Sequence, residues 1–357
     1  MAGWKKVWAG VLALILSAGL AAGCKGRGQG TPGSQAGEDV RGEISAERLK
    51  VVTTLFPYYD FTRQIAGDKV DLTMVVPAGM DSHSFEPTPA DMRRIQEADI
   101  LICNGGAMEQ WVSQVTEALD TSHLTVVTMM DYVDVVEEEM VEGMEDEGHE
   151  HSHMNVHGDS PVRGDGDGAH FHEEHFRQEE EEYDEHIWTS PVNAMRFTEA
   201  ITDALILADP ANRQVYEAGR DSYLQELEGV HQMLLQVARD RKRNIIVVGD
   251  KFPFRYLAEE YGFQYRAAFS GCSTDTEPSA RTIAYLIDKV RQEEIPAVYY
   301  LELSSHRVSE IIGEETGAEP MLLHSCHNVT RKEFDAGITY VDLMLQNAEN
   351  LRKGLDE

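Results

Sequence analysis

The chain has 357 residues, enough for two domains that each bury their own core. Its formal net charge is −32, but residues 137–185 alone carry 19 Asp and Glu against two Arg. The remainder is moderately acidic, which argues against nucleic acid as a partner and favours cations.

The first 23 residues predict a secretory signal peptide. Lys5 and Lys6 precede a short apolar run, and small residues follow it. Such a run is too short for a membrane-spanning helix. The ending Leu20-Ala21-Ala22-Gly23-Cys24 resembles a bacterial lipobox, so we expect Cys24 to carry a lipid; a chance cysteine after an ordinary signal peptide is the alternative. Residues 24–44 predict a flexible tether.

Residues 45–209 predict an N-terminal α/β lobe. Strands are expected at 49–54, 70–76, 100–103 and 124–128, and helices at 56–66, 89–98, 108–119 and 191–207. Thr88 followed by Pro89 and Asp91 is typical of a helix start. Strands that alternate with helices imply parallel pairing with right-handed crossovers.

Residues 210–241 predict one long helix. Its apolar stripe follows helical spacing and comprises Tyr216, Tyr223, Leu227, Val230, Leu234 and Val237. At 1.5 Å per residue it would be roughly 45 Å long, which suits a rigid connection between lobes. An ordinary core helix within one large domain is the alternative.

Residues 242–357 repeat the α/β alternation. Strands are expected at 245–248, 263–269, 298–301 and 321–324, with helices at 254–261, 279–293, 305–316 and 340–351. The predicted fold is therefore two parallel-sheet α/β lobes joined by a long rigid helix.

The acidic stretch 137–185 is also rich in histidine. Seven of the 14 histidines of the chain fall within 27 residues of it: His149, His151, His153, His157, His170, His172 and His175. Imidazole is a common ligand for zinc and similar metals. The tract is either a low-affinity metal collector or a solvated linker whose metal affinity is incidental.

Four further groups of polar residues follow predicted strands or the acidic stretch: residues 79–87, 184–186, 269–272 and 324–328. Ligands of open parallel sheets bind beyond the carboxyl ends of the strands. A cleft between the lobes would bring His83, His186 and the histidines of the last loop together. Imidazoles with one carboxylate or thiolate satisfy a tetrahedral zinc site.

Several motifs resemble the zinc/manganese solute-binding receptors of ABC transporters. They are Gly-x-Asp-x-His-x-Phe-Glu-Pro at 79–87, Asn-Gly-Gly-x-Met-Glu-x-Trp at 104–111, the acidic-spacer-His-Ile-Trp sequence around His186, and Tyr-x-x-x-Met at 340–344. The resemblance covers residues 49–353. It implies a metal site in the interlobe cleft and an extracytoplasmic, lipid-anchored receptor that delivers zinc to a membrane permease and its ATPase, without catalysis.

The resemblance assigns His83 and His186 as the first two metal ligands. The second half departs from the family pattern, because Asp250-Lys251 stands where a histidine is common and His324-Ser325-Cys326-His327 stands where an acidic ligand is usual. His327 is expected to replace the missing ligand, with His324 as second choice. Asp250 could add an oxygen.

The cysteines at predicted strand ends admit two interpretations. Cys272 and Cys326 are expected to form a disulfide in an oxidising compartment, with zinc thiolates as the alternative. Cys103 follows an apolar strand and is expected in the core.

Three rival functions remain open. A manganese receptor of the same family is possible, although a nitrogen-rich ligand set favours zinc. A metal-buffering or adhesin lipoprotein without a transport role is the second. A zinc hydrolase is disfavoured because residues 172–175 lack the His-Glu-x-x-His spacing.

Overall fold

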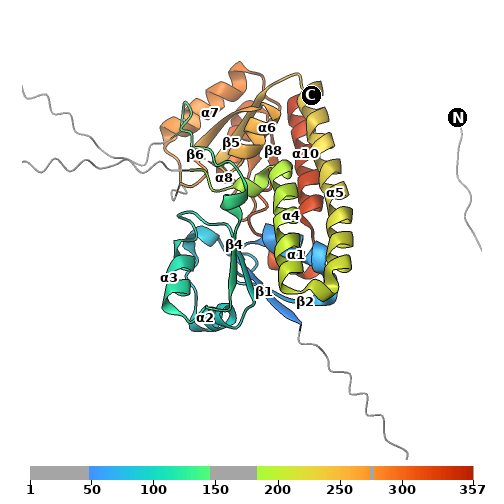
Figure 1. The fold of residues 1–357 in the computed structure, drawn as a ribbon. Coiled ribbons are helices and arrows are strands. Elements are labelled where there is room, and N and C mark those ends of the chain that lie inside the picture. Colours follow the sequence, from blue (N-terminus) through green and yellow to red (C-terminus); the bar gives the residue numbers. More distant parts are fainter. Residues whose placement is uncertain (1–47, 145–182, 274–276, 357) are drawn as a thin grey trace, which may run out of the picture. The chain divides into compact units, whose positions relative to one another are not determined.

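The computed structural model describes residues 48–144, 183–273 and 277–356, and the fold concerns these residues (Figure 1). The first lobe contains a four-stranded parallel sheet in the order β2-β1-β3-β4. Its strands are β1 (Leu49–Thr53), β2 (Val70–Met74), β3 (Ile100–Cys103) and β4 (Thr125–Thr128). The β3 strand is buried throughout, as expected of a central parallel strand between helices.

The helices of this lobe are α1 (Phe56–Ala66), α2 (Pro89–Gln96), α3 (Gln110–Ala118) and α4 (Pro191–Ala208), with 3₁₀ turns η1 (Gly67–Lys69), η2 (Ser82–Ser84), η3 (Met129–Tyr132) and η4 (Ile187–Thr189). The predicted start of α2 is present in full. Thr88 and Asp91 form a reciprocal capping box, and Pro89 occupies the first turn.

The second lobe repeats this architecture with strand order β6-β5-β7-β8, again all parallel. Its strands are β5 (Ile245–Phe252), β6 (Gln264–Ser270), β7 (Ala297–Tyr300) and β8 (Glu319–Leu322). Its helices are α6 (Arg255–Tyr261), α7 (Ala280–Gln292), α8 (Arg307–Thr316), α9 (Arg331–Ala336) and α10 (Tyr340–Asp356).

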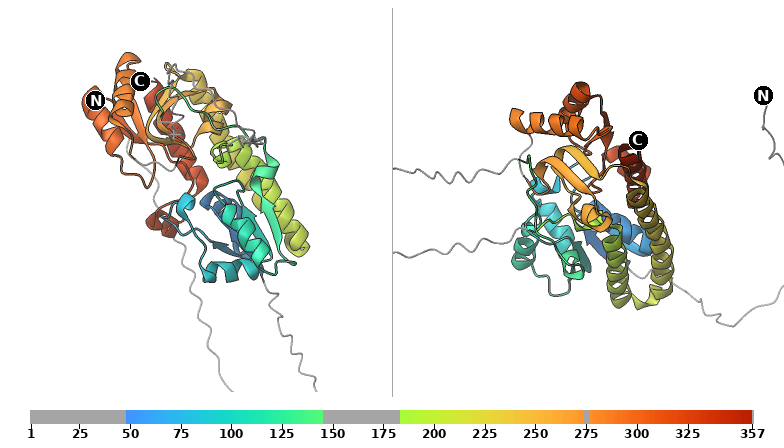
Figure 2. Two further views of the ribbon diagram at one scale, coloured as in Figure 1. Left: turned by 90° about the vertical axis from the view of Figure 1, so that its left-hand side faces the viewer. Right: turned by 90° about the horizontal axis from the view of Figure 1, so that it is seen from above.

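One helix connects the lobes. After the turn η5 (Pro210–Asn212), α5 (Arg213–Asp240) runs for 28 residues, about 42 Å at helical rise. All six residues of the predicted apolar stripe are buried. The helix packs against α1 and α4 of the first lobe and α10 of the second, and Figures 1 and 2 show these helices side by side. The predicted fold, two parallel lobes joined by a long helix, is confirmed.

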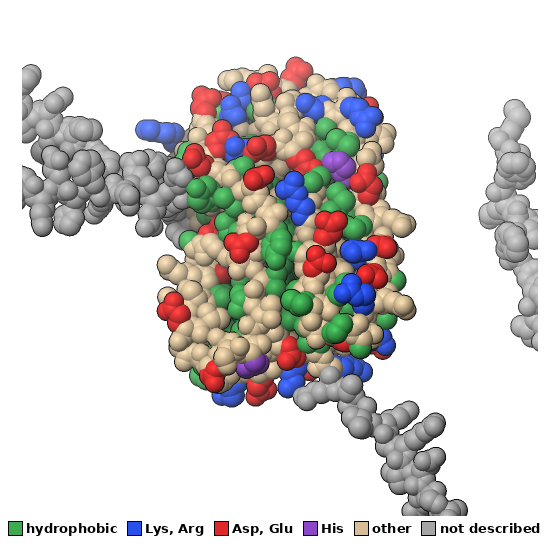
Figure 3. Space-filling model, viewed as in Figure 1, with side chains coloured by type: hydrophobic (Ala, Val, Ile, Leu, Met, Phe, Trp, Pro, Cys, Tyr) green, Lys and Arg blue, Asp and Glu red, His purple; other side chains and the backbone are tan. Residues whose placement is uncertain are grey.

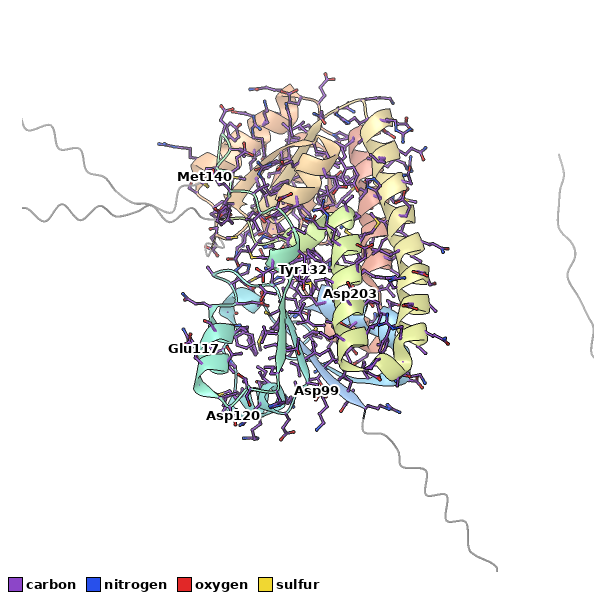
Figure 4. The ribbon with its side chains drawn as sticks, in the orientation of Figure 1. Asp99, Glu117, Asp120, Tyr132, Met140 and Asp203 are labelled. Carbon is purple, nitrogen blue, oxygen red and sulfur yellow. The ribbon has the colours of Figure 1, made fainter. Side chains whose placement is uncertain are left out.

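The loops that follow the strands of both sheets face one cleft between the lobes. Asp99 lies at the entrance of β3, and Figure 4 places it at the far end of the first lobe from the second. The carboxyl ends of the strands therefore point toward the other lobe. Loops that follow strands of both sheets line one cavity between the lobes.

The clearest differences from the sequence expectation concern β5 and α9, and α10 also ends five residues beyond the expected residue 351. The β5 strand extends four residues beyond Val248, with a register shift between Val248 and Lys251 where it pairs with β6. This extension carries Asp250 and Lys251 to the cavity wall. The short helix α9, with its own capping box at Thr330 and Glu333, was not expected. Among the described residues, no helix is long and apolar enough to cross a membrane.

Candidate metal centre

The cavity between the lobes has a volume of about 300 Å³. The first lobe contributes Asp81, His83 and His186, and the second contributes the larger part of the wall: Asp250, Lys251, Pro253, Gly271, Leu301, Glu302, Leu303, Ser304, Ser305, Ser325 and His327. Three of these residues are carboxylates and one is a lysine, so the wall favours a cation.

Three imidazoles converge in this cavity. The ring centroids of His83 and His186 are 5.7 Å apart, those of His83 and His327 are 5.5 Å apart, and those of His186 and His327 are 6.3 Å apart. Potential ligand atoms of Asp81, His83 and His327 all lie within 4.8 Å of one another. His186 is not within that group, but its ring is the third imidazole beside it. Three imidazole nitrogens and the Asp81 oxygen are a donor set of the kind that tetrahedral zinc prefers.

His83 is positioned by the turn η2. The Asp81 side chain caps this turn and accepts the backbone N–H of His83 at 3.0 Å. Burial, reinforced by the neighbouring charge of His186, lowers the pKa of His83 from 6.5 to about 4. The imidazole is therefore neutral at physiological pH and can donate a lone pair to a metal.

His186 is only 2% exposed and is held by Asp184. The Asp184 carboxylate accepts its backbone N–H at 2.8 Å and lies 3.2 Å from its Nδ1. Burial opposes the charged imidazole, but the Asp184 carboxylate outweighs it and raises the pKa of His186 well above its usual value. A carboxylate at Nδ1 is the usual way to orient a metal-binding imidazole.

Gly271 allows the wall to approach His186. A Cβ at this position would lie 3.0 Å from the Asp184 carboxylate and 3.2 Å from Cε1 of His186.

His327 comes from the loop after β8. Its ring stacks on Trp188, with centroids 5.5 Å apart, and its Nε2 hydrogen-bonds the hydroxyl of Ser82. Its backbone N–H donates to the Ser325 hydroxyl at 3.2 Å. Burial and the charges of His83 and His186 lower the pKa of His327, so this ring is also neutral.

His324 lies apart from the cavity wall, unlike His327. Its side chain is 1% exposed, and its Nδ1 accepts the backbone N–H of Cys326 at 2.9 Å. Cys326 has a left-handed backbone with φ of 60°, which turns the chain between the two histidines. One imidazole therefore faces the cavity and the other faces the interior.

The cysteines are all free thiols among the described residues, so the expected disulfide between Cys272 and Cys326 is not formed in this structure. Cys326 is buried, with its thiol 3.6 Å from the carbonyl oxygen of His324. Cys272 instead interacts with the His186 imidazole. Cys103 is buried in the core as predicted, and burial raises its pKa to about 12.

The described ends of the acidic loop are fixed beside this site. Glu137 and Tyr183 form an antiparallel bridge, and Asp184 donates to Val136 at 2.9 Å. From Tyr132 the chain crosses to the second lobe, where Figure 4 shows Met140. There Glu138 accepts the backbone N–H of Cys272 at 2.8 Å. The seven tract histidines and Cys24 lie outside the described residues.

The sequence motif at residues 104–111 also supports the site. The backbone N–H groups of Ala107 and Met108 donate to the Glu185 carboxylate, at 2.8 Å for Met108. The Met108 sulfur accepts the hydroxyl of Ser82 at 3.0 Å. This loop therefore holds the neighbours of both His83 and His186, a role that sequence reasoning did not assign.

The same loop is anchored by Glu109, whose carboxylate accepts two backbone N–H groups, from Asn104 at 2.6 Å and Gly105 at 3.1 Å. Burial raises the pKa of Glu109 to about 7.

Two features define the class of this protein: one long helix packs on both lobes, and histidines from each lobe line one cleft. The chain therefore has the architecture of a bilobed metal-binding receptor. The chain belongs to the family described as zinc-uptake complex component A, periplasmic, whose model matches residues 51–354. The family predicted from the motifs is confirmed. Its members are solute-binding receptors for zinc uptake that work with ABC importers.

Relatives and solved structures agree with this family. The high-affinity zinc uptake system protein ZnuA of Bacillus subtilis is 29% identical over 350 residues, which cover 98% of both chains. The zinc-binding lipoprotein AdcA of Streptococcus pneumoniae is 29% identical over 87% of this chain, which spans 56% of that relative.

Among solved structures, the metal-dependent lipoprotein YcdH of Bacillus subtilis has a TM-score of 0.68 at 28% identity and covers 87% of this chain and 100% of its own. The Zn(II)-bound ZnuA-like domain of Streptococcus pneumoniae AdcA has a TM-score of 0.66 at 25% identity, with the same coverage.

Proposed function

We propose that this protein is a high-affinity zinc receptor that binds one zinc ion in the interlobe cleft through His83, His186 and His327. Asp81 supplies the fourth ligand. The observation that carries the proposal is the convergence of these three imidazoles, from both lobes, within one cavity. The receptor then delivers the ion to the permease of an ABC importer, which a cytoplasmic ATPase drives.

The electrostatics favour capture of a divalent cation. Two of the three imidazoles are neutral at physiological pH, and the wall carries the carboxylates Asp81, Asp250 and Glu302 against one lysine. His324 is not a ligand in this proposal, because its ring lies apart from the cavity wall. A nitrogen-rich set favours zinc over manganese, which prefers carboxylate oxygens.

The parts of the chain beyond the described residues have proposed roles as well. Residues 1–23 direct export, Cys24 carries the lipid that anchors the protein to the outer face of the cell membrane, and residues 24–44 tether the folded part. The tract histidines collect zinc weakly near the cleft. The similarity to lipoproteins of the same family supports this assignment.

Zinc titration of single-site variants tests the ligand set. His83→Ala and His327→Ala should each weaken tight zinc binding by about a hundredfold or more, because each removes a coordinate bond that no neighbour replaces. His324→Ala, from the same loop as His327, should leave the affinity within about threefold of the wild type. Competition with a chromophoric chelator measures each affinity.

Deletion of residues 145–182 separates the tract from the cleft. This deletion keeps Tyr183 and Met144, so the described anchor beside Cys272 remains. Only weak sites should be lost. Loss of the tight site on deletion, or an unchanged affinity in His327→Ala, would refute the proposal.

A further inference from the structure

A second contact between the lobes lies next to His327. Asn328 is 2% exposed, and its side-chain amide donates to two carbonyl oxygens of the first lobe, Pro77 at 2.8 Å and Met80 at 2.7 Å. Its Oδ1 accepts the backbone N–H of Val329 at 2.8 Å. Both amide hydrogens of this second-lobe residue are therefore used on the opposite lobe.

The turn that Asn328 binds leads directly to His83. Met80 donates its backbone N–H to Pro77 at 3.1 Å, and Gly79 within this turn has φ of 86°, a conformation that suits glycine. Asp81 follows and caps η2, which carries His83. On the other side, Asn328 is covalently joined to His327. The hydrogen bonds of Asn328 therefore connect the turn before His83 in the first lobe with the residue after His327 in the second lobe.

Asn328 sits on a firmly held loop. Val329 is fully buried, and Thr330 forms the capping box of α9. Earlier in the loop, the backbone N–H of Ser325 donates to the Glu302 carboxylate at 2.8 Å within the second lobe. These contacts attach the loop to the second lobe on both sides of Asn328, so a separation of the cleft loops would break its two hydrogen bonds to the first lobe.

We propose that Asn328 is a positioning residue of the zinc site. It does not coordinate zinc, but it slows the release of the ion. Its two hydrogen bonds hold the loop of His83 against the loop of His327, so that both imidazoles reach one ion. Release of the ion requires His83 and His327 to separate, and this separation breaks both hydrogen bonds. The inference rests on the proposed function, because it takes these two histidines as ligands.

Asn328→Asp is the sharpest variant. It keeps the shape of the side chain and the acceptor for Val329, but it removes both donors and faces two carbonyl oxygens with a charge. Because two buried hydrogen bonds are lost, we expect zinc release to accelerate about tenfold or more. The rate is measured by chasing the zinc-loaded protein with excess chelator. The absorption spectrum of the Co²⁺-loaded protein should also change, because the two histidines no longer keep their relative positions.

Asn350→Asp is the matched control. The Asn350 amide donates to the carbonyl oxygen of Leu322 at 2.8 Å, entirely within the second lobe. Its zinc release rate and its Co²⁺ spectrum should equal those of the wild type. Asn328→Ser, which introduces no charge, should accelerate release in the same direction and serves if the aspartate variant fails to fold.

Two results would overturn the proposal. One is a folded Asn328 variant with wild-type release rate and Co²⁺ spectrum. The other is equal acceleration in the Asn350 variant, which would reveal general loosening. Failure of the proposed function is distinguishable, because it would appear as tight zinc binding that persists in His83→Ala and His327→Ala.

Discussion

All three histidines of the cleft share one local arrangement. The backbone N–H of each histidine donates to a side-chain oxygen of the residue two positions earlier. These acceptors are Asp81 for His83, Asp184 for His186 and Ser325 for His327. Short side chains of this kind make such turns readily. The arrangement fixes the backbone beneath each imidazole before any metal binds.

The opposite pKa shifts of these histidines predict how many protons zinc displaces. His83, with a pKa of about 4, and His327, whose pKa is also lowered, carry no proton to lose at pH 7. His186 has a raised pKa and binds a proton there. Zinc should therefore release about one proton at pH 7, and its affinity should fall as pH falls below 7.

Calorimetry in buffers of different ionisation enthalpy counts these protons. Asp184→Asn removes the carboxylate that raises the pKa of His186, so this variant should release fewer protons at pH 7. Asp68→Asn, at an exposed surface carboxylate, should release the same number as the wild type. Zinc binding without proton release, or equal release in the Asp184 variant, would contradict the assignment.

At the residue scale, the sequence predicted His83 and His186 from their motifs and preferred His327 to His324 as the replacement ligand, without a structural reason for that order. Both histidines occupy one loop, and no spacing rule separates them. The left-handed backbone at Cys326 decides which one faces the cavity. The contributions of Ser82, Trp188 and Asn328 were not predictable, because they depend on how the two lobes meet.

At the scale of elements, the close packing of the connecting helix α5 on α1 depends on one glycine. A Cβ at Gly219 would lie 2.9 Å from the carbonyl carbon and Cα of Ile65 in α1. Gly229, in the same helix, is exposed and has open space around its Cα. The first glycine permits close packing of α5 on the first lobe, and the second has no such role.

Alanine substitutions at these two glycines should act in opposite directions. Gly219→Ala should lower the free energy of unfolding by about 1–3 kcal/mol, because it overpacks the contact with α1. Gly229→Ala should raise it by about 0.5–1 kcal/mol through helix propensity. Urea unfolding monitored by circular dichroism measures both changes. Equal effects from the two substitutions would contradict the packing argument.

Most elements were predictable because their periodicity and caps are local. The extension of β5 was not, since Gly249-Asp250-Lys251 is typical of a loop. The strand continues only because Lys251 and Phe252 pair with Phe269 and Ser270 of β6 after the register shift. Close packing of Ser309 against Gly249 also requires glycine there, as a Cβ would lie 2.9 Å from the backbone nitrogen of Ser309.

At the scale of the whole molecule, the two lobes are held against each other over much of their length. The α5 helix packs on both lobes, and Arg63 of α1 donates to the carbonyl oxygen of Ile338 in the second lobe at 2.7 Å. Buried Asp60 accepts the N–H of Tyr340 at 2.7 Å. Such a frame favours small movements of the cleft loops over large domain closure.

Charge is distributed in a way that suits this function. Figure 3 shows acidic and basic side chains interspersed over one face of the folded part. The strongest concentration of acidic residues lies instead in residues 137–185, whose described ends are anchored beside the cleft. The proposed role of the tract as a weak zinc collector requires this proximity of its described ends to the cleft.

X-ray absorption at the zinc edge tests the central claim most directly. The variant lacking residues 145–182, loaded with less than one equivalent of zinc, reports on the cleft alone. We predict three imidazole nitrogens and one oxygen at about 2.0 Å from zinc, with no sulfur. A sulfur at about 2.3 Å, which Cys272 would supply, or fewer than three imidazoles would contradict the assignment of His83, His186 and His327.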